Sequence, residues 1–584
     1  MRAPALLLLC CLFPYVQSAL ADRLEIPLRI AFDTIGEALG RQLAYREGRC
    51  RSMKLDKPAL DAVDGRLRLS GPASGSLGIE LSGNCQNVAA WHGTVQLTLE
   101  PWLDKAGRLR MRIHDSRLTG SPGGGTALLW DLSKPHVHPR LQAFSYDIGA
   151  LRTALIGIVR SVAPPEHGAE LEAMLANLEI LQPRIDATGV VVPVALEVPA
   201  PWLTPPPAGA SIAPLTEAEL TALDAALQPW DAFLAYTIKQ LALDSEDRAL
   251  RQRLFTLLLE SRYELAAILS GETRTPGDPV RALFIDAWGE LRTILADARY
   301  AVFLDAGDAL VALDRAAPGL GMRVSADGLR QLARSLRPGA GADPLAYDWA
   351  VDPQLGALFD VEPIPQPAPS PPGRSWLDLF ITRAHAADEK PLDRWVPSRG
   401  ELTAYEARIG ELLHKTSASE LQRGGLAAPY HPVYRSLVPA TALIESCWRQ
   451  YELRSGKVSY LRSASGSVGI MQINQHVWRG FYDVQRLRWD TAYNMRAGAQ
   501  ILLRYLKDYA IPYAERSGDL NHVPRAAYAV YNAGPRAVGR FSKKPPHPRE
   551  QRVDERLWTL YQGVASGAQV DLRNCNVSNA TASQ

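Results

Sequence analysis

The sequence predicts a multidomain protein with a β-rich (α+β) N-terminal domain, a helical middle domain and a mostly helical C-terminal domain. The first observation is length, because 584 residues correspond to two to four domains of ordinary size. The second is a change of hydrophobic period, from the alternation of strands before Pro199 to the spacing of helices after it. The third is a pair of proline-rich segments that divide the chain.

The composition is that of an ordinary globular protein. Hydrophobic residues make up 47% and charged residues 22% of the chain, which excludes a wholly disordered protein. A formal net charge of +2 gives no strong attraction to nucleic acid or to anionic membranes, so we expect no nucleic-acid partner.

Residues 1–21 have the pattern of a secretory signal peptide. Arg2 supplies the positive charge, residues 5–13 form the apolar stretch, and Ala19 and Ala21 form a small-x-small cleavage site. The apolar stretch is shorter than the roughly 20 residues of a membrane-spanning helix. We therefore expect an exported protein, and an N-terminal membrane anchor is the alternative.

Cysteines support this expectation, because disulfides form in exported proteins. The four that remain after removal of the signal are Cys50, Cys85, Cys447 and Cys575. Sequence proximity favours the pair Cys50–Cys85, which leaves Cys447 and Cys575 to pair or to remain thiols. No pair has the spacing of metal ligands, so we expect no metal site.

The predicted β-rich domain covers residues 22–199. Its strand-like segments alternate or are rich in Val and Leu, and they are residues 65–70, 94–102, 108–118 and 190–199. Residues 151–162 and 169–181 interrupt them with helical patterns.

A proline-rich hinge (200–213) precedes the predicted helical domain (214–361). Thr216 followed by Glu219 has the spacing of a capping box at a helix start. A second proline-rich linker (362–390) has a composition that favours extended polyproline structure. It separates these domains from a C-terminal domain, residues 391–570, and a polar tail, residues 571–584.

Four short motifs follow one another in the C-terminal domain. They are ALIES (442–446), SASGSVGIMQIN (463–474), YNMRAGAQILLRYL (493–506) and AAYAVYNAGP (526–535). This series resembles the lysozyme-like catalytic domain of bacterial lytic transglycosylases of the soluble type. That family has Glu-Ser at a helix end, then Ser-x-x-Gly-x-x-Gly-hydrophobic-Met-Gln, then Asn-hydrophobic-x-x-Gly, then Tyr-Asn-Ala-Gly.

The resemblance implies a lysozyme-like fold and a periplasmic enzyme that cleaves peptidoglycan glycan strands without a cofactor. It implies cleavage of the β-1,4 bond between N-acetylmuramic acid and N-acetylglucosamine, with a 1,6-anhydro ring as the new end. By position, Glu445 is the catalytic acid and then base. The predicted substrate-binding residues are Ser463, Gly469, Met471, Gln472, Tyr531 and Asn532. The predicted supporting residues are Ser446, Asn494 and Gly498. Ser465, Ser467, Ile470 and Trp448 depart from the usual pattern and leave substrate preference open.

Physical chemistry gives an independent reason to single out Glu445. A glycosidic oxygen needs a proton donor near neutral pH, whereas a solvated Glu with a pKa of about 4.3 is ionised. Leu443, Ile444 and Trp448 are apolar neighbours that would raise the pKa of Glu445 if the fold turns them toward it. The alternative is a solvated acid at a helix end. We further expect the Tyr531 hydroxyl to bond either Glu445 or the N-acetyl group of the sugar.

Other functions remain open at this stage. A muramidase of the lysozyme type would use the same acid with water as nucleophile, and a non-catalytic protein would bind glycan without cutting it. Three aspartates lie in the region, but no motif marks one as a second catalytic carboxylate. Residues 24–43 and 95–118 are faintly similar to tubular lipid-binding domains, so the N-terminal domain is expected to bind lipid or envelope proteins.

Overall fold

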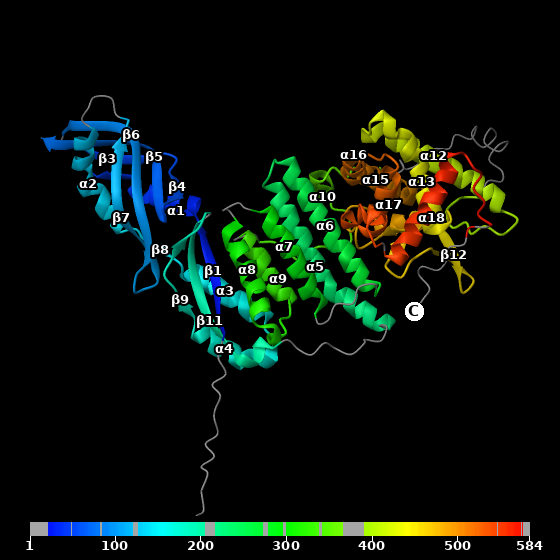
Figure 1. Ribbon diagram of the computed structural model, residues 1–584, viewed down its shortest axis with the longest axis horizontal. Helices are drawn as coiled ribbons and strands as arrows, with labels where there is room; N and C mark the ends of the chain where they lie inside the picture. The colour runs from blue at the N-terminus through cyan, green and yellow to red at the C-terminus, as the bar shows by residue number, and fades with distance from the viewer. Residues whose placement is uncertain are drawn as a thin grey trace, which may run out of the picture. The chain divides into compact units, whose positions relative to one another are not determined.

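The computed structural model confirms the predicted fold class, with a β-rich N-terminal part, helices in the middle and a mostly helical C-terminal part (Figure 1). The described residues are 22–47, 50–81, 84–120, 126–187, 189–204, 216–271, 278–295, 300–337, 341–365, 390–545, 547–573 and 575. The predicted signal peptide and most of the hinge, of the linker and of the polar tail lie outside them.

The chain divides into two compact units. The N-terminal unit comprises residues 1–208 and 296–338, and the C-terminal unit comprises residues 209–295 and 339–584. The predicted helical middle domain (214–361) is therefore not one compact body, because its helices are shared between the two units.

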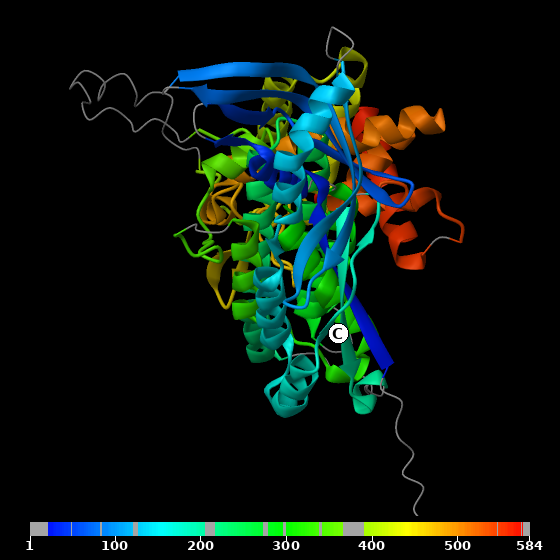
Figure 2. The same ribbon diagram turned by 90° about the vertical axis from the view of Figure 1, so that its left-hand side faces the viewer.

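The N-terminal unit contains a seven-stranded antiparallel sheet with strand order β2-β3-β5-β6-β7-β8, and β4 pairs with β5 (Figures 1 and 2). Its strands are β2 (Tyr45–Glu47), β3 (Arg51–Leu55), β4 (Ala59–Val63), β5 (Arg66–Leu81), β6 (Asn84–Leu103), β7 (Arg108–Thr119) and β8 (Tyr146–Asp147). The expected pair Cys50–Cys85 forms a disulfide beside β3 and β6, with Cα atoms 5.2 Å apart.

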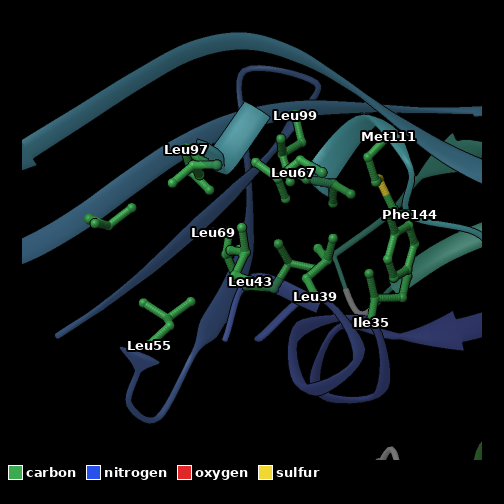
Figure 3. Close-up of a cluster of buried hydrophobic side chains, with 14 of the residues drawn as sticks. Ile35, Leu39, Leu43, Leu55, Leu67, Leu69, Leu97, Leu99, Met111 and Phe144 are labelled. Carbon is green, nitrogen blue, oxygen red and sulfur yellow. The ribbon is translucent and has the colours of Figure 1, made fainter. Parts of the chain in front are cut away.

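Helices α1 (Phe32–Leu43) and α2 (Thr126–Gln142) pack on one face of this sheet. Ile35, Leu39 and Leu43 recur every four residues on α1 and are fully buried against sheet residues such as Leu67 and Leu97 (Figure 3). Burial of each such side chain contributes about 1.5–3 kcal/mol. These two helices thus fill this face of the sheet. Lipid binding by the N-terminal domain stays a prediction.

A second, four-stranded antiparallel sheet completes the unit. It consists of β1 (Asp22–Ala31), β9 (Glu179–Ile180), β10 (Arg184–Ile185) and β11 (Gly189–Val198). Strand β11 is almost wholly buried because helices cover the sheet, and Asp305 accepts a hydrogen bond from the Arg29 backbone at 2.6 Å. The remaining helices of this unit are α3 (Gly149–Val162), α4 (Gly168–Ala176), α8 (Ala301–Ala316) and α9 (Ala326–Leu336).

The C-terminal unit begins with three helices from the middle of the chain, α5 (Glu217–Leu243), α6 (Arg248–Leu269) and α7 (Pro279–Ile294). The predicted capping box is present at the start of α5, since Glu219 accepts a hydrogen bond from the Thr216 backbone at 2.7 Å. In the described part of the chain, no helix combines the length and the apolar character that are needed to cross a lipid bilayer.

The rest of the unit is mainly helical. Its helices are α10 (Pro353–Leu358), α12 (Leu402–Gly424), α13 (His431–Ser446), α14 (Val484–Trp489), α15 (Thr491–Tyr505), α16 (Ile511–Ser517), α17 (His522–Ala533) and α18 (Pro548–Ala565). A π-helical turn, η7 (Leu506–Ala510), joins α15 to α16. Two short hairpins, β12 (Tyr451–Arg454) with β13 (Lys457–Tyr460) and β14 (Ser467–Val468) with β15 (Ile473–Asn474), follow α13.

Candidate active site

Glu445 lies in the last turn of α13, where the sequence predicted it. The helix ends one residue later because Cys447 and Trp448 both adopt left-handed backbone conformations, with φ of 51° and 56°. Such conformations cost about 1–3 kcal/mol for residues other than glycine and gather at functional sites. This sharp end to the helix leaves the Glu445 side chain half-buried.

The environment of Glu445 favours its protonated form. Burial raises the pKa of Glu445 to about 7, against the opposing effects of the Tyr528 hydroxyl and the positive charge of Arg540. Its Oε1 atom is buried and has no hydrogen-bond partner among the described residues. The side chain can therefore hold a proton at neutral pH and present it to a ligand.

Ser446 joins the first motif to the second. Its hydroxyl is fully buried and lies 3.0 Å from the Ala442 carbonyl and 2.6 Å from the Ile470 carbonyl. This contact holds the end of α13 against the loop that contains Ile470, in keeping with the predicted supporting role.

The second and third motifs form one buried core. Asn494 accepts a hydrogen bond from the Met471 backbone at 2.9 Å and donates to the Val468 carbonyl at 3.0 Å. A Cβ atom on Gly498 would lie 2.6 Å from the Met471 side chain, and one on Gly469 would lie 2.3 Å from the Asn494 amide. Asn494 and Gly498 thus lie in supporting positions.

Two of the predicted substrate-binding residues are buried by packing, and their contact with substrate stays a prediction. The Met471 side chain is fully buried against Gly498, and Gly469 is buried beneath Asn494 with φ of +75°. Both residues pack inside a tight loop, where Gly469 adopts a backbone conformation that favours glycine.

Ser463 and Gln472 remain half-buried. The Ser463 hydroxyl accepts a hydrogen bond from the Ser467 backbone at 3.0 Å and lies 2.9 Å from the Ser465 hydroxyl. The Gln472 amide donates to the Gly469 carbonyl at 2.8 Å. Both side chains stabilise their own loop, and their contact with substrate stays a prediction.

The fourth motif differs from expectation in the partner of its tyrosine. The Tyr531 hydroxyl donates to the Met471 carbonyl at 2.6 Å, so it is not the donor to Glu445. The neighbour that hydrogen-bonds Glu445 is Tyr528, one helical turn earlier on α17 and 2% exposed. Tyr528 was not predicted, although its i, i+3 spacing from Tyr531 places both on the same helix face. Asn532 is exposed, as a sugar-binding residue must be.

A buried ion pair behind the fourth motif was also not predicted. Arg540 and Asp554 are 5% and 3% exposed, and their charged groups approach to 2.7 Å. Arg540 also donates to the Asn532 side chain at 2.8 Å. The pair therefore orients Asn532, and Asp554 supplies the counter-charge of Arg540.

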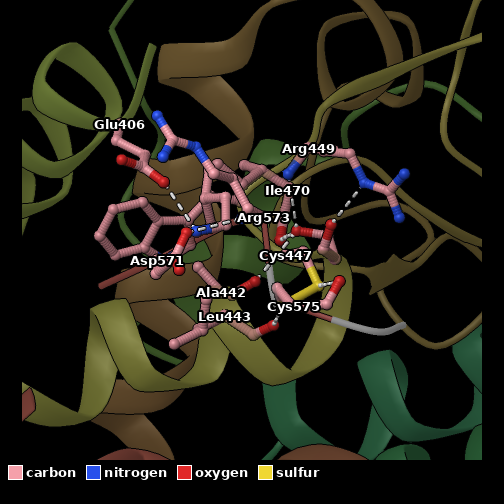
Figure 4. The surroundings of a disulfide bond; sticks show 12 residues. Glu406, Ala442, Leu443, Cys447, Arg449, Ile470, Asp571, Arg573 and Cys575 are labelled. Atoms are coloured by element: carbon pink, nitrogen blue, oxygen red, sulfur yellow. Dashed lines mark hydrogen bonds between the residues drawn. A yellow bond between two sulfur atoms is a disulfide. The ribbon is translucent and has the colours of Figure 1, made fainter. Parts of the chain in front are cut away.

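A disulfide fixes the backbone next to the end of α13. Cys447, two residues after Glu445, is bonded to Cys575, with Cα atoms 5.9 Å apart (Figure 4). The chain around Cys575 is held further by Glu406, which accepts a hydrogen bond from the Leu572 backbone at 2.7 Å. The second pairing, which the sequence left open, thus ties the C-terminal segment to the end of α13.

Loss of this disulfide should destabilise the C-terminal unit. Cys575→Ser is expected to lower the free energy of unfolding by about 2–4 kcal/mol, because the cross-link restricts the unfolded chain. Hydrogen exchange of peptides from α13 under oxidising conditions measures the effect. Cys85→Ser, which breaks the disulfide of the N-terminal unit, is the matched control and should leave exchange in α13 unchanged. Equal exchange in all three proteins would contradict the prediction.

The carboxylates considered as a second catalytic group have structural partners. Asp483 caps α14 and Asp490 caps α15 through backbone N–H groups. Asp508 pairs with Arg504 at 3.2 Å. Among the described residues, no carboxylate is one of the groups that shift the pKa of Glu445.

The comparison with family models decides the class of this site. Residues 433–553 match the model described as the Transglycosylase SLT domain. This part of the chain is therefore similar to SLT domains. Neither the search of curated proteins nor that of solved structures found a match. The SLT domain contains all four motifs and supports a transglycosylase-type enzyme that acts on peptidoglycan.

A large cavity of this unit lies away from the predicted site residues. A cavity of about 980 Å³ is lined mainly by α6, α12 and α15, and none of the predicted site residues lines it. In the described part of the chain, no group of three or more His, Cys, Asp or Glu side chains is arranged to hold a metal ion.

The raised pKa of Glu445 has a consequence for stability. Its folded pKa of about 7 lies above the ordinary value of 4.5, so ionisation destabilises the folded state as the pH rises. Glu445→Gln is therefore expected to stabilise the protein by an amount that grows between about pH 4.5 and 7 and is at most about 3 kcal/mol above pH 7. Urea unfolding of both proteins across this range measures it, and a difference independent of pH would contradict it.

Proposed function

We propose that the protein is a peptidoglycan lytic transglycosylase that cleaves the β-1,4 bond between N-acetylmuramic acid and N-acetylglucosamine. Glu445 is the observation that carries the proposal. It is a half-buried acid within an SLT domain, and its pKa of about 7 suits a group that both donates and accepts a proton.

In the first step, protonated Glu445 donates its proton to the glycosidic oxygen, and the bond from that oxygen to C1 of N-acetylmuramic acid breaks. The N-acetyl group of the same sugar stabilises the positive charge that develops at C1. The departing sugar leaves with a hydroxyl group. The Tyr528 hydroxyl and the positive charge of Arg540 stabilise the resulting Glu445 carboxylate.

In the second step, the carboxylate accepts the proton of the C6 hydroxyl, and the C6 oxygen bonds to C1. This closes the 1,6-anhydro ring and returns Glu445 to its protonated form, so that no water is consumed. A pKa near 7 favours this step as well, because a carboxylate with an ordinary pKa is a weaker base.

Among the described residues, no carboxylate is one of the groups that shift the pKa of Glu445, which supports this route over a two-carboxylate hydrolysis. Mass spectrometry of digested cell wall tests the proposal. Fragments that end in 1,6-anhydro-muramic acid are expected. Fragments that end only in reducing sugars would instead favour the muramidase alternative.

We also propose that the enzyme is exported to the periplasm. The two disulfides support this, because such bonds persist in oxidising compartments. N-terminal sequencing of the mature protein from a periplasmic fraction should begin at residue 22. Recovery of the intact first residue in a membrane fraction would favour the anchor alternative.

A further inference from the structure

Helix α6 lies outside the segment that matches the SLT family, but its side chains contact two of the catalytic motifs. The Tyr263 hydroxyl donates to the Tyr531 carbonyl at 3.0 Å. It also lies 3.1 Å from the Tyr505 hydroxyl, and because its own proton is used, Tyr505 is the donor in that contact. Tyr263 therefore joins the third motif to the fourth.

The glycine of the fourth motif makes room for this tyrosine. A Cβ atom on Gly534 would lie 2.9 Å from the ring of Tyr263, and the φ of Gly534 is +85°. A larger residue would therefore clash with α6 as well as strain the backbone. The Tyr-Asn-Ala-Gly turn is thus shaped to accept a side chain from α6.

The neighbouring residue on α6 holds the segment after the second motif. Arg262 is 1% exposed and donates to the carbonyls of Val477 at 3.3 Å and Arg479 at 2.8 Å. Its charge is paired with Asp231 of α5 at 2.6 Å. Arg262 thus contacts the segment that follows the second motif, and the adjacent Tyr263 contacts the fourth motif.

Glu445 lies within electrostatic range of Tyr263. Burial raises the pKa of Tyr263, and the charge of Glu445 adds to this effect, whereas the hydrogen bond with Tyr505 opposes it. The Tyr263 hydroxyl donates to the Tyr531 carbonyl, and the Tyr531 hydroxyl in turn donates to the Met471 carbonyl. The chain of contacts runs from α6 through Tyr531 to the Met-Gln loop.

We propose that Tyr263 is a positioning residue of the active site and that α6 belongs to the catalytic unit, which therefore extends beyond residues 433–553. The inference rests on the proposed function for its effect on catalysis. Tyr263 fixes the backbone of Tyr531 and so the position of the adjacent Asn532 and of the loop opposite it. A displacement of about 1 Å at such a position can cost roughly 100-fold in rate.

Two matched variants of the full-length protein test this. Tyr263→Phe removes only the hydroxyl. Thr256→Val removes a hydroxyl from the same helix, where it lies 2.7 Å from the Tyr509 hydroxyl in an equivalent interhelical contact. On soluble glycan strands, Tyr263→Phe should lower kcat about tenfold with KM within about twofold, because no group that touches the sugar is removed. Thr256→Val should retain the kcat of the wild type, and both should have the same Tm.

Hydrogen exchange of residues 526–535 is a second readout that does not depend on activity. Exchange there should be faster in Tyr263→Phe than in Thr256→Val or the wild type. Equal kcat in the two variants, or equal exchange, would overturn the inference. If the wild type cuts no glycan, the proposed function fails but the exchange comparison still decides whether Tyr263 positions Tyr531. If the wild type yields reducing ends, the reaction is hydrolysis and the kinetic comparison stands.

Discussion

Replacement of Glu445 by Gln is expected to abolish cleavage of purified peptidoglycan, with a loss of roughly 1,000-fold or more. The substitution keeps the size of the side chain but removes the group that is proposed to donate the first proton and accept the second. The rate of release of soluble fragments from purified cell wall is the measurement.

The matched control is Glu452→Gln. Glu452 lies on β12, is 27% exposed and pairs with Arg454 at 2.6 Å, so the same substitution is made at a site of similar exposure without catalytic neighbours. It should retain the rate of the wild type. Unchanged cleavage by Glu445→Gln would mean that Glu445 is not the catalyst. Binding without any cleavage by the wild type would favour the non-catalytic alternative.

Asp554→Asn should change both stability and pH dependence. It leaves the buried guanidinium of Arg540 without its counter-charge, and breaking such a pair costs about 3–5 kcal/mol. The unbalanced charge of Arg540 also favours the ionised form of Glu445 and lowers its pKa. Since the reaction needs protonated Glu445, the alkaline limb of the kcat/KM profile is expected to move to lower pH.

A control for this effect breaks a different ion pair in the same unit, one whose carboxylate is buried. Glu420 is 3% exposed and pairs with Arg496 at 2.7 Å, and neither residue is among the groups that shift the pKa of Glu445. Glu420→Gln should therefore leave the pH profile in place. If both variants moved the alkaline limb equally, the shift would reflect loss of structure and the electrostatic account of Arg540 would be wrong.

Local patterns in the sequence were sufficient for features that depend on neighbouring residues. The capping box of Thr216 and Glu219, and the position of Glu445 at a helix end, depend on spacing within one or two turns. The division of the middle helices between two units could not be read in this way. It depends on which apolar faces meet in space, and helical periodicity does not give that information.

The parts of the site that were missed involve contacts distant in sequence. Tyr263 contacts a residue 268 positions away. The Arg540–Asp554 pair is closer in sequence, but its burial depends on the packing of α18 against α17. Met471 was expected at a sugar-binding surface, yet the glycine at position 498 admits its side chain to the core. A motif identifies residue types, whereas the fold decides which of them face the substrate.

Glu445 is expected to titrate near pH 7, so that a large fraction of its carboxyl groups is still protonated at neutral pH. Infrared difference spectroscopy of the wild type against Glu445→Gln isolates the band of this one protonated carboxyl group, and its intensity can be followed across a pH titration. A midpoint near pH 7 is predicted. A midpoint between about pH 4 and 5, the range of a solvated Glu, would contradict the account.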